Sequence, residues 1–373
     1  MKHFRFEFKK LIWTKKFLIA LILLIVAVSL LLYRNILLQD YAKEQKMNET
    51  SSFIKFHRNK EFAYERELEI GGNNEETEML KEKNEVVLQS ALEWSSIEIK
   101  DQDWRAILQS EISFLEQARE YKEMGEEHPL DDRELTYRLT LNNELLNKNI
   151  PPDYEKYSVA LPNFTKQVVD LFVMYGSFFI VLVLISELLS HEFESRSIFF
   201  QFTQPLNRAN IVLSKFLSAI VMYIILSFVM LLISVVATSI FGKQGYFEYP
   251  ILIELDGVLQ SITITDYLTY ALIANAVIIM FMIALYLLYS VLTQHTLLSL
   301  FLTTGTILFG YFFTMLINWA PFAWINPFRY VLSTDYILFQ NNQVWYQAIP
   351  ITIVLTIAFL IIAMQKIKKS KVE

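Results

Sequence analysis

Long uncharged apolar runs limit what this chain can fold into more than any other feature. Several runs reach about 20 residues, which is the length that an α-helix needs to cross ~30 Å of hydrocarbon. Apolar residues make up 54% of the 373 residues. A helix of this length satisfies its own backbone hydrogen bonds inside lipid, so the sequence predicts an all-α polytopic membrane protein.

Six runs are predicted to be transmembrane spans, at residues 17–33, 167–189, 211–241, 266–292, 297–318 and 346–364. Basic residues dominate the first 16 positions, and four lysines lie in the C-terminal tail, 365–373. Basic flanks mark the cytoplasmic side of a membrane. Both termini are therefore predicted to be cytoplasmic, which agrees with an even number of spans.

Residues 1–16 have an amphipathic pattern. Phe4, Phe8, Leu11 and Ile12 fall at helical spacing on one face, and Lys and Arg lie on the other. This pattern predicts an interfacial helix on the inner leaflet. A basic leader that only sets the topology is the alternative.

Residues 34–165, between the first two predicted spans, are polar and charged and are predicted to form an extracellular helical domain. A turn signal at 71–74, Gly-Gly-Asn-Asn, ends a first helix expected at about 38–68. Two further extracellular loops are expected, at 243–265 and 319–345.

Two capping signals divide the rest of the predicted extracellular domain into helices. Asp101 or Asp103 would cap a helix that carries Trp104. Asp131, followed by Glu134, is a start signal for the next helix.

The segment 190–210, between the second and third predicted spans, is charged, aromatic and broken by proline. Acids and Arg196 come first, and apolar residues follow at 198–202. Pro205 lacks the N–H that a continuing helix needs. The pattern predicts a short amphipathic cytoplasmic helix whose aromatic face needs a protein partner or the lipid interface.

Three stretches of this region resemble the cytoplasmic loop of ABC-2 type transporter permeases: Glu192-Phe193-Glu194-Ser195-Arg196-Ser197, Thr203-Gln204-Pro205-Leu206-Asn207-Arg208, and Lys215. Arg196-Ser197 stands where that family has a Gly-Thr-like pair. The stretch from Trp324 to Tyr330 resembles the family's final loop. The resemblance covers 1–33 and 166–370 and leaves the predicted extracellular domain unidentified.

The resemblance implies that 190–210 is a coupling helix, which docks on a separate ATP-hydrolysing subunit. Aromatic side chains would fill a groove on that subunit, and charges would fix the orientation. The candidate ATPase-coupling residues are Glu187, Glu192, Glu194, Arg196, Ile198, Phe199, Phe202, Thr203, Gln204, Pro205, Arg208 and Lys215.

The resemblance also implies partners and a direction. The chain would pair with two copies of a cytoplasmic ABC ATPase subunit, which would bind ATP and magnesium, and with a second permease, either a copy or a paralogue. The complex would lie in the lipid of a bacterial cytoplasmic membrane, with no nucleic-acid partner. The expected function is export of an amphipathic substrate: a peptide, a toxin or antibiotic, or a lipid-like molecule.

Two other functions stay open from the sequence. One is a non-transporting membrane receptor or immunity protein that binds a ligand outside the cell. The other is an ABC-type sodium ion extruder.

The sequence does not predict an enzyme. A phosphate loop needs the pattern G-x-x-x-x-G-K-[S/T], whereas Gly242-Lys243 is followed by Gln244. The five histidines are scattered and the chain has no cysteine, so we expect no metal site and no bound cofactor.

Four residues within the spans are candidates for a transport pathway or for helix packing. Asp170 lies near the outer end of the second span, where an acid is either functional or a helix-start residue favoured by the dipole. Thr303, Thr304 and Gly305 lie in the fifth span, and small and hydroxyl side chains permit close helix packing.

Overall fold

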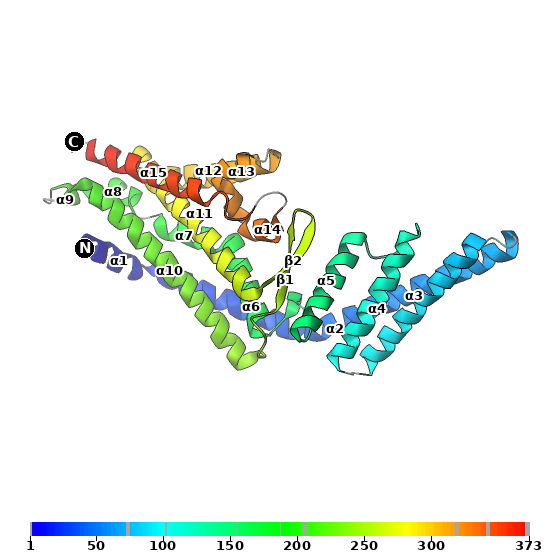
Figure 1. Cartoon of the computed structure of the whole chain (residues 1–373). Coiled ribbons are helices and arrows are strands. Elements are labelled where there is room, and N and C mark those ends of the chain that lie inside the picture. Colours follow the sequence, from blue (N-terminus) through cyan, green and yellow to red (C-terminus); the bar gives the residue numbers. More distant parts are fainter. Residues whose placement is uncertain are drawn as a thin grey trace.

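The computed structural model describes residues 2–71, 75–100, 103–153, 155–186, 188–203, 207–317, 321–340 and 344–369. Figure 1 shows an elongated molecule with a membrane part, which holds both ends of the chain, and a helical head domain at the opposite end. Within the described residues, six helices are long and apolar enough to cross a membrane. This confirms the predicted all-α polytopic fold.

A short N-terminal helix, α1 (Lys2–Ile12), precedes one continuous helix of 57 residues, α2 (Lys15–Gly71). The predicted break between a span at 17–33 and a separate helix at 38–68 is wrong. α2 contains no proline, and its only glycine is its last residue, so nothing interrupts the helix where the apolar run ends. At 1.5 Å per residue, α2 is about 85 Å long. It carries the chain from the membrane part into the head domain (Figure 1).

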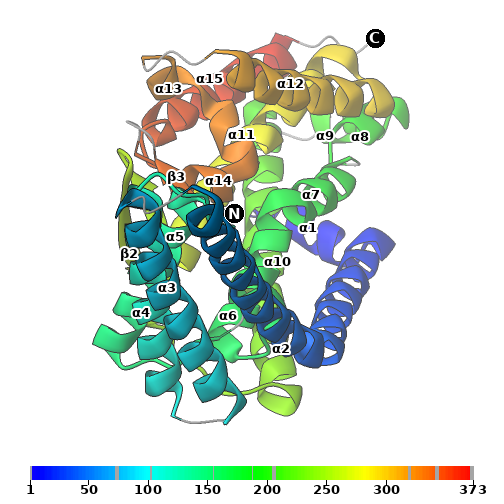
Figure 2. The same cartoon turned by 90° about the vertical axis from the view of Figure 1, so that its right-hand side faces the viewer.

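Three helices complete the head domain: α3 (Glu75–Ile99), α4 (Trp104–Glu123) and α5 (Asp132–Lys148). α3 packs against the far half of α2, α4 packs against α3, and α5 packs against α4. Figure 2 shows these helices in front of the membrane part. Their core is aromatic and aliphatic, and its largest buried side chains are Phe53, Trp94, Phe114, Leu115, Tyr121 and Leu135.

The capping signals of the head domain are confirmed where they can be compared. The Asp103 carboxylate accepts a hydrogen bond from the amide of Arg105 at the start of α4. The Asp131 carboxylate accepts one from the amide of Glu134 at the start of α5. Asp101, the alternative cap for α4, lies outside the described residues.

The second span contains a turn of π-helix. α6 (Leu161–Leu171) leads into the π-turn η2 (Phe172–Gly176) and then into α7 (Ser177–Ile185). The Asn275 amide donates a hydrogen bond of 3.1 Å to the carbonyl oxygen of Val173 within this turn. The sequence predicts a regular helix, because a π-turn has no compositional signal and depends here on a partner from another span.

The remaining spans are α10 (Arg208–Phe241), α11 (Ile264–Thr293), α12 (Thr296–Leu316) and α15 (Ile349–Lys369). α11 is the central helix: most of its side chains are buried, and it packs against α15, α12 and α6. The other spans therefore leave much of their apolar surface for lipid.

Two short helices connect the second and third spans: α8 (Ser190–Glu194) and α9 (Ile198–Phe202). The sequence predicts one helix over this segment. Arg196 has a φ of 57°, in the left-handed region, and this residue separates the two helices.

A small sheet forms near the head domain. β1 (Pro250–Leu255) pairs antiparallel with β2 (Val258–Thr263) and parallel with β3 (Phe339–Gln340). Asp256 and Gly257 both have positive φ, 52° and 79°, which is the backbone of a tight hairpin turn. The Asp-Gly pair was a hairpin signal in the sequence, and the sheet was not predicted.

The predicted loop at 319–345 also contains ordered elements. They are α13 (Phe322–Ile325), η3 (Pro327–Leu332) and α14 (Ser333–Leu338), followed by β3. The 3-10 helix η3 packs against α11 and α12, so this segment returns to the membrane part before α15 begins.

Candidate functional site

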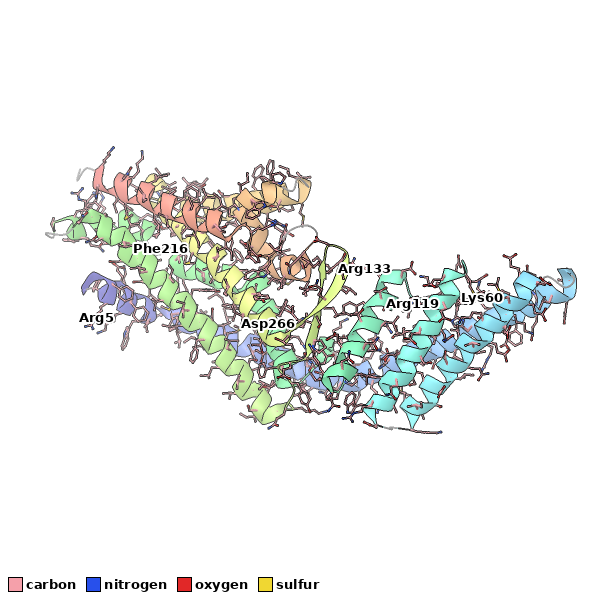
Figure 3. All side chains as sticks on the ribbon, viewed as in Figure 1. Arg5, Lys60, Arg119, Arg133, Phe216 and Asp266 are labelled. Carbon is pink, nitrogen blue, oxygen red and sulfur yellow. The ribbon has the colours of Figure 1, made fainter. Side chains whose placement is uncertain are left out.

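The end of the membrane part far from the head domain brings together α1, α8, α9 and the start of α10 (Figure 1). Figure 3 labels Arg5 of α1 and Phe216 of α10 at this end, and Asp266, which begins α11, toward the head domain. Segments far apart in the sequence therefore meet at one face of the membrane part.

The apolar face predicted for α1 is turned toward the protein. Leu11 is buried and Phe4 and Phe8 are half-buried, because α1 packs along α10. Among residues 4–13, the exposed aromatic side chains are Phe6 and Trp13, at 62% and 77% exposure. α1 is therefore amphipathic as predicted, but its predicted apolar face contacts another helix.

Four charged side chains, three of them buried and the fourth, Lys10, exposed, form a cluster between α1, α8 and α10. Lys215 of α10 is fully buried, and its Nζ lies 3.0 Å from Glu7 Oε2 and 2.8 Å from Glu192 Oε1. Lys10 Nζ lies 2.6 Å from the same Glu192 oxygen. We call Glu7, Lys10, Glu192 and Lys215 the charge cluster. Two of these residues, Glu192 and Lys215, were predicted site residues, and their partners on α1 were not.

The charge cluster joins the three helices because a buried charge without a partner is costly. Its two carboxylates and two ammonium groups balance, so each charge is compensated. Glu192 also accepts a hydrogen bond from Gln201 Nε2 at 3.2 Å, which ties α9 to the same group. Glu192 therefore connects α8 directly to α1, α9 and α10.

α8 makes polar contacts with two further spans. The Glu194 carboxylate accepts hydrogen bonds from the amide of Thr296, at 2.7 Å, and from its hydroxyl, at 2.9 Å. This places a negative charge at the N-terminus of α12, where the helix dipole favours it. The Ser190 hydroxyl lies 2.6 Å from the Tyr286 hydroxyl of α11. One turn and a half of helix therefore contacts α10, α11 and α12.

The exposed aromatic side chain of α9 is Phe200, at 77% exposure. Ile198 is fully buried, and Phe199 and Phe202 are half-buried. The guanidinium of Arg208 covers the ring of Phe202 at 4.4 Å. The sequence analysis counted Phe200 among the apolar residues at 198–202 but did not include it among the candidate coupling residues. The i, i+4 spacing of 198 and 202 would have indicated it, because residues four apart share a helix face and the residue between them lies opposite.

The other predicted coupling residues are less constrained by the structure. Arg196 and Thr203 are exposed, and the Thr203 hydroxyl donates to the carbonyl of Phe200. Glu187, Gln204 and Pro205 lie outside the described residues.

Asp170 takes part in a local polar contact. Its Oδ1 accepts a hydrogen bond of 2.7 Å from the Tyr267 hydroxyl of α11, and its Oδ2 lies 3.3 Å from Lys166 Nζ, one turn earlier. Asp170 is at the end of α6, next to the π-turn, and so it does not start a helix.

The small-residue signal of α12, which also includes Gly310, is only partly reflected in packing within the chain. Thr303 is fully buried, Thr304 is half-buried, and a Cβ at Gly305 would have no neighbour within 4 Å. A Cβ at Gly310 would lie 2.4 Å from the Phe328 ring. The close packing within the chain therefore depends on Gly310, and Gly305 faces outward.

The fold and this site define a class: a polytopic helical membrane protein in which short helices at one membrane face connect several spans. A family model described as ABC-2 family transporter protein matches residues 1–354. The chain belongs to this family, which confirms the resemblance, and the match includes the head domain. No curated protein and no solved structure matches the chain.

Membership defines the general role of the chain. It is a membrane permease subunit of an ABC transporter, and it works with an ABC ATPase subunit.

Proposed function

We propose that this permease belongs to an ATP-driven exporter and that α8 and α9 form the surface on which its ATPase docks. Phe200 is the anchor that enters a groove on the ATPase, and the charges of Glu194, Arg196 and Arg208 orient it. The observation that carries the proposal is that Phe200, the most exposed aromatic side chain of this segment, lies on α9 next to α8, which contacts three spans. The hydrogen bond from Gln201 to Glu192 ties α9 to α8.

The contacts of α8 explain how such docking drives transport. Closure of two ATPase subunits displaces α9, and the charge cluster passes this displacement to α1 and α10. The contacts of Glu194 and Ser190 pass it to α12 and α11. A second permease, a copy or a paralogue, completes the pathway. Both termini lie in the cytoplasm of a bacterium, and the head domain lies outside.

An amphipathic substrate suits the surface of the membrane part. A groove of about 390 Å³ lies between α2 and the second span, and its lining is apolar. Leu24 and Leu31 of α2 face Phe172 and Phe179 across it. This volume is within the range of about 300–1,000 Å³ that small-molecule pockets have.

The docking proposal is tested with Phe200→Asp and a matched control. Tagged protein is purified from its native host in mild detergent, and co-purified ATPase is quantified. Burying a charge in the groove should weaken ATPase binding by about 30-fold or more. Phe62→Asp changes a comparably exposed phenylalanine, 62% exposed, in the head domain and should leave binding unchanged. If Phe200→Asp retains as much ATPase as the control, α9 is not the docking surface.

A further inference from the structure

A pocket of about 450 Å³ with a mixed polar and apolar lining lies where the membrane part meets the head domain. Three parts of the chain line it: residues 39–43 of α2, residues 151–153 and 157–163 before and within α6, and residues 243–249 after α10. We call it the junction pocket. Its volume is within the range of ligand-binding pockets, about 300–1,000 Å³.

One buried wall of the junction pocket presents hydrogen-bond acceptors. Asn163 is 4% exposed, and its Nδ2 donates to Asp153 Oδ2 at 2.5 Å. Ser158 also donates to that carboxylate oxygen. Asn163 Oδ1 is buried and accepts no hydrogen bond from the described residues. A buried acceptor without a donor is unfavourable, so this wall fits a ligand that carries N–H groups.

The rim of the junction pocket carries two cations. Lys43 and Lys243 are exposed, and neither makes a side-chain hydrogen bond or ion pair with the described residues. Asp40 is the acid on the same rim, so the three side chains have a net charge of about +1 at neutral pH. The rim therefore fits an anionic group next to the N–H donors.

The junction pocket lies at the level of a membrane interface. α6 begins and α10 ends beside it, and Phe241, Tyr246 and Phe247 near the end of α10 are exposed. Exposed aromatic side chains at span ends are typical of the headgroup region of a bilayer. The molecules at highest concentration there are lipid headgroups.

We propose that the junction pocket binds the phosphoethanolamine headgroup of a membrane aminophospholipid. The primary ammonium donates to Asn163 Oδ1 and to Asp153, and the phosphate lies between Lys43 and Lys243. A choline headgroup carries no N–H and leaves the Asn163 acceptor unpaired, so the pocket discriminates between the two zwitterionic lipids. This site does not depend on the docking of an ATPase at α9.

The test uses the full chain in detergent with equal amounts of phosphatidylethanolamine, phosphatidylcholine or phosphatidylglycerol, and bound lipid is counted by native mass spectrometry. Phosphatidylethanolamine should bind about tenfold more tightly than phosphatidylcholine. Equal binding of these two lipids, or tightest binding of phosphatidylglycerol, would overturn the proposal. Soluble glycerophosphoethanolamine should compete poorly; equal competition would show that the ligand is not a membrane lipid.

Two sets of variants test whether the lipid binds at the junction pocket. Asn163→Leu should abolish the preference for phosphatidylethanolamine. Asn142→Leu is the matched control, because Asn142 is also buried, at 6% exposure, with an unpaired Nδ2, and it lies in α5 away from the pocket. If Asn163→Leu does not fold, the rim variant Lys43→Gln with Lys243→Gln changes only exposed side chains. It should weaken phosphatidylethanolamine binding about tenfold, and unchanged binding would contradict the proposal.

Discussion

Lys215 is a charged side chain with no exposed surface in a helix of a membrane protein. Such residues are rare and are paired, because an uncompensated charge in a medium of low dielectric constant is unstable. Glu7 and Glu192 supply its partners, from α1 and α8. At the scale of the residue, the charge cluster is therefore the feature that determines how the N-terminal helix and the α8–α9 segment are held together.

Replacing Lys215 by methionine should destabilise the protein by about 3–5 kcal/mol, because Glu7 is left buried without a cation. Lys215→Met combined with Glu7→Gln should recover part of this loss, since no unpaired carboxylate remains at that position. Thermal unfolding of the four proteins of the double-mutant cycle in detergent measures the coupling. If the effects of the two single substitutions add up to the effect of the double variant, the two charges do not interact.

His128, between α4 and α5, makes the stability of the head domain depend on pH. Burial, together with His57 and Lys122, lowers the pKa of His128 from 6.5 to about 3. The unfolded chain therefore binds a proton below pH 6.5 that the folded domain does not bind until about pH 3, so the free energy of unfolding should decrease as the pH falls through this range.

Intrinsic tryptophan fluorescence during thermal unfolding, at neutral pH and below pH 6.5, measures this effect. His128→Asn should reduce the pH dependence, because asparagine does not titrate and its side-chain oxygen can replace Nδ1 as acceptor for the Leu130 amide. The same pH dependence in both proteins would mean that other groups cause it.

At the scale of the element, the continuity of α2 is the main departure from expectation. The change from apolar to charged composition after residue 33 suggested that a helix ends there. Composition decides whether a helix contacts lipid or water, but it does not end the helix. Helices end at caps, glycine or proline, and none of these interrupts α2 before Gly71. The π-turn η2 was not predictable for another reason. It accepts a hydrogen bond from Asn275 of α11, and the local sequence does not show which residue of another span will lie beside it.

A proline in the exposed part of α2 should bend the rod between the membrane part and the head domain. Leu37 is 59% exposed, so Leu37→Pro removes little packing while it breaks a backbone hydrogen bond and costs about 3 kcal/mol. Spin labels on Leu30→Cys and Phe62→Cys lie about 48 Å apart along a straight helix. The chain has no native cysteine to compete for the label.

The distance distribution between these labels should become shorter or broader in Leu37→Pro. Leu37→Ala, which keeps the backbone hydrogen bond, is the control and should leave the distribution unchanged. If the distribution is unchanged in the proline variant, the position of the head domain is fixed by its contacts with the membrane part and not by the continuity of α2.

At the scale of the whole molecule, α2 and α8 connect different parts of the structure. α2 lines the apolar groove, borders the junction pocket and forms the spine of the head domain. α8 contacts three spans at the far end of the membrane part. α10 packs against both α1 and α2, so packed helices connect the α8–α9 end of the membrane part with the groove and the junction pocket.

The sequence by itself determined the number of spans, the helical head domain, the start signals of α4 and α5 and the family. These features depend on local composition, periodicity and caps, which can be recognised within short stretches of the sequence. It also pointed to Glu192 and Lys215, but only as members of a motif. The tertiary structure decided that Lys215 meets Glu7, 208 residues away, that Phe200 is the exposed aromatic side chain of α9, and that Asn163 borders the junction pocket. Such contacts depend on which helices become neighbours and how each is rotated, and that is settled by packing over the whole chain.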